Sequence, residues 1–431
     1  MDRASRDHDS GGSVEPRVVR PLSDFLHTEA AGGIVLVVAT IVALLWANSP
    51  WKDSYFDLWH ARLSISLGSH TIDLDLQEWV NDALMSIFFF VVGLEIKREL
   101  VEGELRDPRR AAMPAIAAIG GMIFPALIFY ALNAGTDASQ GWGIPMATDI
   151  AMAVGVLSLL GSRVVPSLKL FVLALAIVDD IGAIVVIAIV YSSDIHLDAF
   201  AVALGLYVGV GVARLLGIRA AWFYVLLGSL MWLAMFESGV HTTLVGVLLG
   251  LMAPTAPIRQ RQFIDGEALL DLSSVDAAHE TAVLARESVS VVEWLEHLLH
   301  PWTSFVILPL FALANAGIPI SATTLREAST SAVAWGVVLG LVVGKMVGIT
   351  TFTWISHRLK IGTLPNGSSW SGIIGVAVLC GIGFTVSIFV AGLAFDDVGT
   401  QNVAKIGILV ASLIAAVAGS TILATRAGRS R

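Results

Sequence analysis

Charge is scarce in this 431-residue sequence, because Asp, Glu, Lys and Arg make up only 14% of it, against about a quarter in soluble proteins. Cysteine is nearly absent, and the single Cys380 excludes an intramolecular disulfide framework and a cysteine-ligated structural metal. The net charge of −9 argues against a nucleic-acid-binding surface. The sequence instead has 56% hydrophobic residues, 40 glycines and a mean hydropathy of +0.79. This composition predicts an all-α polytopic membrane protein in contact with a lipid bilayer.

Apolar runs recur along the chain, and a helix needs about 20 such residues to cross a bilayer. Of the 26 Lys and Arg residues, 21 fall in the loops on the side of the N-terminus and three on the opposite side. The apolar runs predict about 12 transmembrane helices. By the positive-inside rule, the distribution of Lys and Arg predicts that both termini lie in the cytoplasm. The twelve windows are residues 25–47, 82–101, 111–133, 144–162, 168–191, 198–217, 221–236, 239–253, 302–318, 332–355, 370–394 and 403–425.

The remaining segments predict the domain organisation. Residues 1–24 lack an apolar core, so we expect a polar cytoplasmic tail rather than a signal peptide. Residues 25–425 form one membrane domain, which contains a polar cytoplasmic linker at 257–292 and ends in a short cytoplasmic tail at 426–431. Residues 61–78 alternate with period two, which predicts a β-hairpin on the outer side. This hairpin is either an ordinary capping loop or an exposed edge that pairs with a second subunit in a homodimer.

Two adjacent acids stand at the centre of the window 168–191. On translocon scales a mid-membrane Asp costs about 2.5–3.5 kcal/mol, and folding alone does not require Asp179 or Asp180 there. Adjacent helix positions differ by about 100°, so the two carboxylates face different neighbours. We therefore expect a functional site here rather than a buried pair that is only satisfied structurally.

Glycine and proline interrupt two further windows, at residues 141–149 and 380–385. Unwound backbone is tolerated in a membrane only where it is buried in protein or lines water. Asp149 could offset the positive helix ends that such breaks expose. Lys345, in the middle of its own window, could offset the negative ends or pair with Asp179.

The interrupted windows also repeat. Each of the segments 111–193 and 332–425 holds three windows with a broken middle one, and seven windows separate the two first members. Because seven is odd, the two triplets insert in opposite orientations. This predicts inverted-topology repeats whose two discontinuous helices cross near the bilayer midplane, where the substrate would bind.

Nine stretches carry a resemblance to the NhaA family of bacterial sodium/proton antiporters, which extends from about residue 20 to residue 425. They are residues 81–85, 88–100, 147–151, 176–184, 238–244, 295–302, 314–317, 344–345 and 381–385. The resemblance implies a secondary active transporter of the bacterial inner membrane, neither an enzyme nor dependent on a cofactor. It would exchange cytoplasmic Na⁺ or Li⁺ for external H⁺, with pH regulation and net charge movement.

The resemblance also implies roles for residues. Asp180 would be the main Na⁺ ligand, with Asp179 as its neighbour and as the partner of Lys345, while Thr148 and Asp149 would lie beside the unwound crossing. Since such exchange moves more protons than sodium ions, Asp179 or Lys345 would carry a second proton. The pH response would involve Glu95, Arg98, Glu99, His241, Glu296, His297 and His300.

The residue chemistry is compatible with this implied exchange. Na⁺ and Li⁺ favour oxygen ligands, and burial favours the protonated form of a carboxyl group, so that proton and cation compete for one site. A passive cation channel would explain the acids but not the inverted broken helices or Lys345. An intramembrane aspartyl protease would place its acids on separate helices, whereas Asp179 and Asp180 are adjacent.

Overall fold

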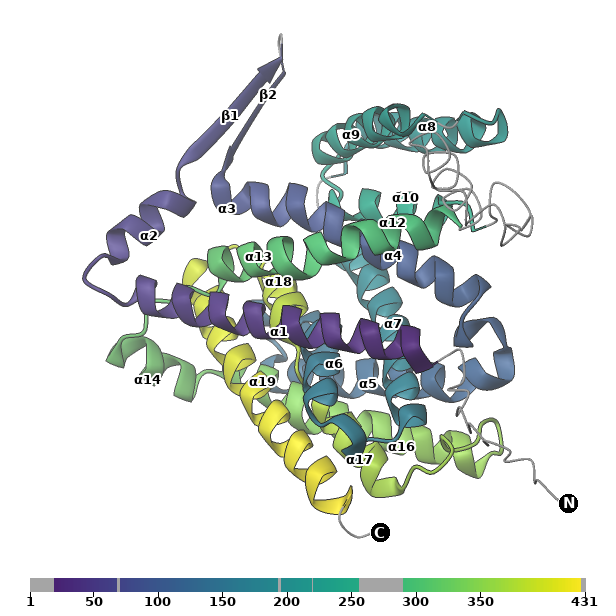
Figure 1. The fold of residues 1–431 in the computed structure, drawn as a ribbon. Helices are drawn as coiled ribbons and strands as arrows, with labels where there is room; N and C mark the ends of the chain where they lie inside the picture. The colour runs from purple at the N-terminus through teal and green to yellow at the C-terminus, as the bar shows by residue number, and fades with distance from the viewer. Residues whose placement is uncertain (1–18, 68–69, 193–194, 219, 256–289, 428–431) are drawn as a thin grey trace, which may run out of the picture.

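The computed structural model describes residues 19–67, 70–192, 195–218, 220–255 and 290–427, which are helical apart from one hairpin and the connecting loops (Figure 1). The predicted linker at 257–292 and tails at 1–24 and 426–431 lie mostly outside these residues. The first half contains α1 (Val19–Ala47), α2 (Lys52–Trp59), α3 (Leu76–Trp79), α4 (Met85–Val101), α5 (Pro108–Asn133), α6 (Ile150–Leu159), α7 (Pro166–Val190), α8 (Leu197–Leu215), α9 (Ala221–Glu237) and α10 (Thr243–Met252).

The second half continues after the segment that is not described. It contains α12 (Val291–Trp302), α13 (Leu308–Asn315), α14 (Ala322–Thr330), α15 (Ala332–Leu339), α16 (Lys345–Arg358), α17 (Trp370–Leu379), α18 (Phe384–Ala394) and α19 (Val398–Ala427). Short π-helices join several of these elements: η1 (Val80–Leu84), η5 (Thr303–Ile307) and η6 (Gly340–Gly344). Short 3₁₀-helices complete the set: η2 (Glu104–Arg106), η3 (Asp137–Met146) and η4 (Gly161–Arg163).

Within the described residues, nine helical segments are long and apolar enough to cross a membrane. The pair α17–α18 passes the same test together but bends by 48°, and α9 and α10 are shorter apolar helices. The nine segments, the bent pair and the two shorter helices together correspond to the twelve sequence windows. The all-α polytopic architecture is therefore confirmed, while the number of crossings stays a prediction. The nine segments are Ala30–Ala47, Leu76–Val101, Pro108–Asn133, Asp137–Leu159, Pro166–Val190, Leu197–Leu215, Val291–Asn315, Ala332–Arg358 and Val398–Thr425.

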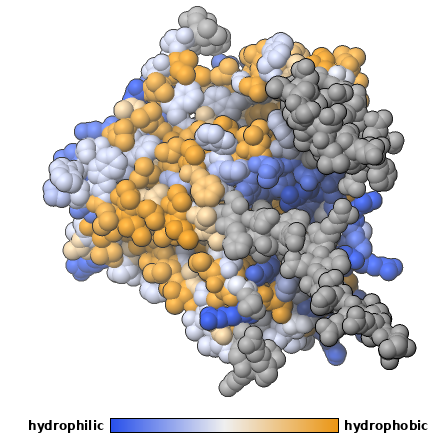
Figure 2. Space-filling view, in the orientation of Figure 1, coloured by the Kyte–Doolittle hydropathy of each residue, from blue (hydrophilic) through white to orange (hydrophobic). Residues whose placement is uncertain are grey.

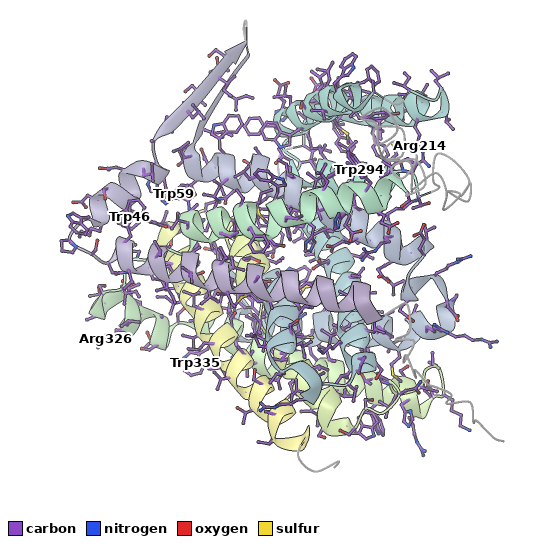
Figure 3. The ribbon with its side chains drawn as sticks, in the orientation of Figure 1. Trp46, Trp59, Arg214, Trp294, Arg326 and Trp335 are labelled. Carbon is purple, nitrogen blue, oxygen red and sulfur yellow. The ribbon has the colours of Figure 1, made fainter. Side chains whose placement is uncertain are left out.

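The outer surface of the helices is apolar, as a surface in contact with lipid requires. Figure 2 shows hydrophobic residues spread over much of the visible face, and Leu45, Leu127 and Leu413 are each more than half exposed. Tryptophan and arginine side chains gather at the two ends of the helical body, with Trp46 and Arg326 at one end and Trp294 and Arg214 at the other in Figure 3. Such residues are typical of the two membrane–water interfaces.

The segment with period-two alternation forms the hairpin of β1 (Arg62–Leu67) and β2 (His70–Asp75), paired antiparallel with Arg62 opposite Asp75. It projects away from the helical body, next to α2 (Figure 1). The ion pair Arg62–Asp73 joins the two strands at 2.7 Å. Leu63 and Ile65 are about half exposed, at 47% and 51%, so the hairpin keeps an apolar face uncovered within this chain.

Close backbone contact fixes the helix that begins with Lys345. A Cβ atom at Gly348 on α16 would lie 2.1 Å from the carbonyl oxygen of Gly120 on α5, and one at Gly120 would lie 2.4 Å from that of Gly348. Only glycine permits this approach, in the manner of small-residue contacts between membrane helices. The contact holds α16 against α5 and thereby positions Lys345 in the interior.

Candidate functional site

The two interrupted segments meet. Between η3 and α6 the chain is extended at residues 147–149, and between α17 and α18 it turns at residues 380–383. The backbone N–H of Asp149 donates to the carbonyl oxygen of Ile382 at 2.7 Å, and the Thr148 hydroxyl donates to the carbonyl oxygen of Cys380 at 2.9 Å. Backbone groups freed at one break are thus satisfied by the other, which is what buried unwound backbone requires.

Asp149 caps two helices at this meeting point. Its Oδ1 accepts from the backbone N–H of Met152 in the first turn of α6, at 3.0 Å. Its Oδ2 accepts from the backbone N–H of Thr385 at 3.0 Å and from the Thr385 hydroxyl at 2.5 Å, in the first turn of α18. One carboxylate therefore faces the positive ends of two half-helices, as the sequence predicts for Asp149.

Asp179 and Lys345 form a buried ion pair. The Lys345 Nζ lies 2.7 Å from Oδ2 of Asp179, and the two side chains are 0% and 1% exposed. The sequence suggests that Lys345 either offsets negative helix ends or pairs with Asp179, and the structure shows the pair with Asp179. The Asp179 Oδ1 is buried and has no hydrogen-bond partner among the described residues. The backbone and side chain of Thr148 lie close to the Asp179 carboxylate, and a buried carboxylate oxygen outside good hydrogen-bond geometry is a place where a proton, a water or an ion can bind.

Asp180 faces a different neighbourhood from Asp179, as its position on α7 requires. It lines a narrow cavity of about 40 Å³ together with Glu95, Thr148, Asp149 and His300, whose walls also include Thr303, Ser304 and Thr385. The side chain is buried but borders this cavity, and among the described residues its carboxylate forms no ion pair with Lys or Arg. The carboxylates of Asp179, Glu95 and Asp149 act on Asp180 from nearby. We call this space the narrow cavity.

The residues of the expected pH-response set occupy several places. Glu95 and His300 line the narrow cavity. Arg98 donates to Glu296 in an ion pair between α4 and α12. Glu99 accepts from the backbone N–H of Glu104 at 3.0 Å, in the loop after α4. The sixth residue, His297, is exposed on α12.

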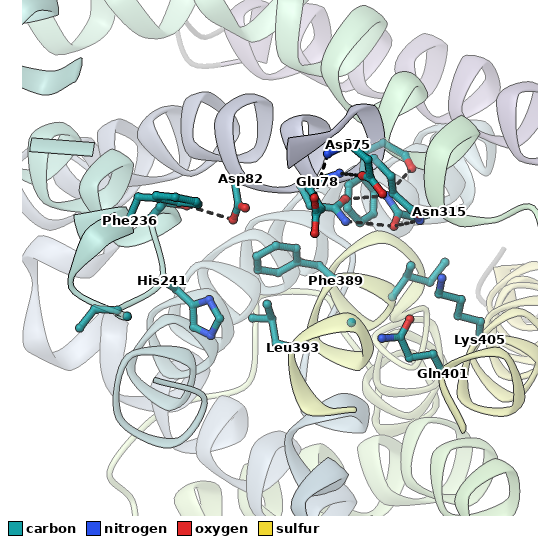
Figure 4. Close-up of a pocket in the computed structure, with 18 residues that line it drawn as sticks. Asp75, Glu78, Asp82, Phe236, His241, Asn315, Phe389, Leu393, Gln401 and Lys405 are labelled. Atoms are coloured by element: carbon teal, nitrogen blue, oxygen red, sulfur yellow. Dashed lines mark hydrogen bonds between the residues drawn. The ribbon is translucent and has the colours of Figure 1, made fainter. Parts of the chain in front are cut away.

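His241 lies apart from this set, in a second and larger space. Its Nε2 is 2.5 Å from the carbonyl oxygen of Tyr191, and it lines a cavity of about 460 Å³, which we call the wide cavity. Figure 4 shows Asp82 and His241 on one side of this cavity and Gln401 and Lys405 on the other. The structure therefore separates His241 from the other six residues of the expected pH-response set.

The same helices line both cavities. On α18, Thr385 and Val386 face the narrow cavity, whereas Phe389 and Leu393 face the wide one. Phe389 packs against two further aromatic rings, with centroid distances of 5.6 Å to Phe89 and 6.3 Å to Phe311. Phe311 and Phe389 line the wide cavity, whereas Phe89 lies between Phe88 and Val91, which line the narrow cavity. An apolar layer thus separates the two spaces.

Several residues of these cavities are outside the set that sequence reasoning assigned. Thr385 belongs to a motif noted in the sequence, but its two bonds to Asp149 depend on how the breaks meet. Asp82 accepts from the Thr242 hydroxyl at 3.1 Å at the wide cavity, and Lys405 lines the same space. Lys405 could have been identified from the sequence because it is a charged residue within a predicted span, which is how Lys345 was identified.

The arrangement brings oxygen ligands and an ionisable group together. Asp180 offers a carboxylate beside hydroxyl groups of Thr303, Ser304 and Thr385, and oxygen atoms are the ligands that hard cations prefer. A carboxylate oxygen binds either a proton or a cation with full strength, but not both. Within the described part of the chain, no group of three or more His, Cys, Asp or Glu side chains is arranged to hold a metal ion.

Comparison with known proteins gives a consistent result. A family model described as Na⁺/H⁺ antiporter 1 matches residues 23–423. The Na(+)/H(+) antiporter NhaA of Rhodopirellula baltica is 46% identical over 422 residues, covering 94% of this chain and 94% of the relative. NhaA 2 of Sorangium cellulosum is 46% identical over 420 residues (94% and 90%), and NhaA 2 of Syntrophotalea carbinolica is 43% identical over 426 residues (95% and 97%). The chain belongs to the NhaA family of Na⁺/H⁺ antiporters.

Proposed function

We propose that this multi-pass membrane protein exchanges cytoplasmic Na⁺, or Li⁺, for external H⁺ by competition of the two ions at Asp180. The observation that carries the proposal is the Asp180 carboxylate, which borders the narrow cavity without an ion-pair partner among the described residues. An unpaired carboxylate buried in a membrane is costly, so it binds a proton or a cation whenever one is available. Membership of a Na⁺/H⁺ antiporter family supports the identity of the two ions.

The proposed cycle uses this single site on both sides of the membrane. In the inward-facing state Na⁺ displaces the proton from Asp180, with oxygen atoms of Thr303, Ser304 or Thr385 available as further ligands. After a rearrangement of the helices around the crossing, external protons displace Na⁺. The meeting of the two breaks at Asp149 supports this, because a capped but discontinuous helix pair can shift as a unit.

The Asp179–Lys345 pair is the proposed site of the second proton. Its Asp179 oxygen without a partner and its contact with Lys345 place two ionisable groups beside Asp180. Breaking the pair by adding a proton to Asp179, or by removing one from Lys345, would change the charge next to bound Na⁺. Exchange of two protons for one Na⁺ would then move net charge, so that transport responds to the membrane potential.

The proposed orientation puts the narrow cavity on the cytoplasmic side of the bacterial inner membrane. The basic stretch 97–110 begins in the last turns of α4, whose Glu95 lines this cavity, and the positive-inside rule places such stretches in the cytoplasm. The wide cavity begins at Asp75, at the foot of the hairpin, and would face outwards. Both termini are cytoplasmic in this orientation.

Two further features belong to the proposal. The Arg98–Glu296 ion pair and the acids and histidines near it support a pH response on the cytoplasmic side. The hairpin, with Leu63 and Ile65 about half exposed, supports a homodimer in which the hairpin packs against the partner subunit, since exposed apolar edges favour pairing.

Exchange by purified protein in proteoliposomes tests the proposal. A pH-sensitive dye inside the vesicles should report proton movement on addition of Na⁺ or Li⁺ but not of K⁺, and Asp180→Asn should abolish it while the protein still inserts and unfolds normally. Saturation with Na⁺ and dependence on a counter-ion distinguish exchange from a passive channel. Sodium-driven proton flux near the wild-type rate in Asp180→Asn would overturn the assignment.

A further inference from the structure

Lys405 is a second buried lysine inside a membrane-spanning helix, and the proposed cycle gives it no role. It lies seven residues after the start of α19, or about 10 Å along the helix axis. The side chain is only 7% exposed. Among the described residues, no carboxylate lies within ion-pair distance of it, in contrast to Lys345. Folding alone does not call for such a charge at this position.

The side chain of Lys405 borders the wide cavity, so that its ammonium group faces the interior of that space (Figure 4). The same cavity is lined by the acids Asp75, Glu78 and Asp82. Two of these acids are engaged with one another's backbone, because Asp75 and Glu78 form a capping box at the start of α3. Asp82 accepts from Thr242. The cavity is thus lined by three acids and one lysine, and Figure 4 shows Asp82 and Lys405 on opposite sides of it.

A cavity with an excess of acids collects cations, because low-dielectric walls focus the field of its charges. For an exporter that must release Na⁺ outwards and accept H⁺, cations held in the outward cavity are a disadvantage, since they rebind at Asp180 in competition with protons. The ammonium group of Lys405 in the same space opposes this accumulation.

We propose that the positive charge of Lys405 lowers cation occupancy of the wide cavity and so limits inhibition of exchange by external Na⁺. This inference rests on the proposed function and on the outward orientation of the wide cavity. Lys405 acts there through its charge and through its position on the wall. It makes no contact with the Asp180 site, which opens on the other side of the aromatic layer of Phe89, Phe311 and Phe389.

The test uses the full chain in proteoliposomes of known orientation, with Na⁺ added separately to each face. In Lys405→Gln, the external Na⁺ concentration that halves exchange should fall by about 3- to 10-fold, in line with the effect of one charge in a focusing cleft. Half-saturation by Na⁺ on the cytoplasmic face should stay within about twofold of wild type, since Lys405 lines the wide cavity and not the narrow one. Lys405→Arg should behave as wild type. Arg326→Gln is the matched control, because it removes one positive charge from the exposed helix α14.

A cysteine variant keeps the test independent of the glutamine variant. Lys405→Cys should show the same increase in external inhibition, and a membrane-impermeant trimethylammonioethyl thiosulfonate added outside should reverse it by restoring a positive charge. A neutral methyl thiosulfonate should not. The native Cys380 is fully buried, so it interferes little.

The outcomes separate the two proposals. If wild-type protein shows no Na⁺-driven proton movement, the proposed function fails. If wild-type exchange is normal but Lys405→Gln matches Arg326→Gln, or changes Na⁺ dependence equally on both faces, only the role of Lys405 is overturned.

Discussion

Two buried lysines lie within the described membrane-spanning segments, and their surroundings differ. Lys345 is 0% exposed and lies 2.7 Å from Asp179, whereas Lys405 is 7% exposed, borders the wide cavity and has no ion pair among the described residues. A charge in a membrane protein is stabilised either by an opposite charge or by water. The ion pair makes Lys345 part of the packed interior, whereas the charge of Lys405 acts on ions in the wide cavity.

The largest expected effect is a difference in stability between a variant of Lys345 and the same variant of Lys405. Lys345→Met leaves the Asp179 carboxylate buried without its partner and should lower the free energy of unfolding by about 3–5 kcal/mol. Lys405→Met removes a charge that has no partner and should change it by less than about 1 kcal/mol. Unfolding of each purified variant in detergent, followed by tryptophan fluorescence, measures the difference.

A double variant is the control for this comparison. Lys345→Met combined with Asp179→Asn removes both charges and should recover part of the lost stability, because no unpaired charge remains. If Lys345→Met and Lys405→Met lower stability equally, the contrast between the two lysines is wrong.

The next effect concerns the helix that carries Lys345. Gly348→Ala places a Cβ atom 2.1 Å from the carbonyl oxygen of Gly120, and should lower stability by up to about 3 kcal/mol. Gly392→Ala, where no atom lies within 4 Å of the new Cβ, should be tolerated. The midpoint of thermal unfolding compares the two, and an equal midpoint would mean that α5 and α16 are not held by this contact.

The bonds of Asp149 give a smaller effect. Thr385→Val removes the hydroxyl donor at 2.5 Å but keeps the backbone donor at 3.0 Å. It should lower the free energy of unfolding by about 1.5 kcal/mol, the lower end of the range for a hydrogen bond to a charged group. Thr385→Ser keeps the hydroxyl and should behave almost as wild type. Equal destabilisation by both would assign the effect to the lost methyl group instead.

The smallest effect contrasts the buried ion pair with an exposed one of the same length. Arg62 and Asp73 are also 2.7 Å apart, but in water. Hydrogen bonds from Ser64 and Arg62 lower the pKa of Asp73 below its ordinary value. This stabilisation is therefore present above the ordinary pKa of an aspartate and is lost as the pH falls through the lowered value.

Amide protection factors of the hairpin measure this last effect. They should decrease slightly between pH 7 and pH 3, and Asp73→Asn should show the low value at both. Higher protection at pH 3 in the wild type would contradict the sign of the effect. The small size follows from solvent screening of an exposed pair.

Sequence reasoning identified the groups whose presence in a span is costly. Asp179, Asp180 and Lys345 stand out because a charge in an apolar window needs a reason, and the paired breaks stand out because glycine and proline oppose continuous helix. The all-α polytopic fold follows from the same apolar windows. These signals are local in the chain.

The remaining features depend on which segments meet in space. The Thr385 hydroxyl serves Asp149 only because two breaks cross, and the wide cavity exists because η1, α13, α18 and α19 leave room beside one another. The separation of His241 from the other pH-response residues has the same origin. The three π-helices, of which η6 ends just before Lys345, change the direction of side chains without a clear mark in the sequence.

Competition of Na⁺ and H⁺ at Asp180 is tested most directly by calorimetric titration of the purified protein with Na⁺ at several pH values. In the acidic range, where the proton occupies the site, the apparent dissociation constant of Na⁺ should rise up to about tenfold for each unit by which the pH falls, with proton release on binding, because one carboxylate holds either ion. Asp180→Asn should give no Na⁺ binding heat at any pH. A dissociation constant that does not change with pH, or Na⁺ binding that persists in Asp180→Asn, would contradict the mechanism.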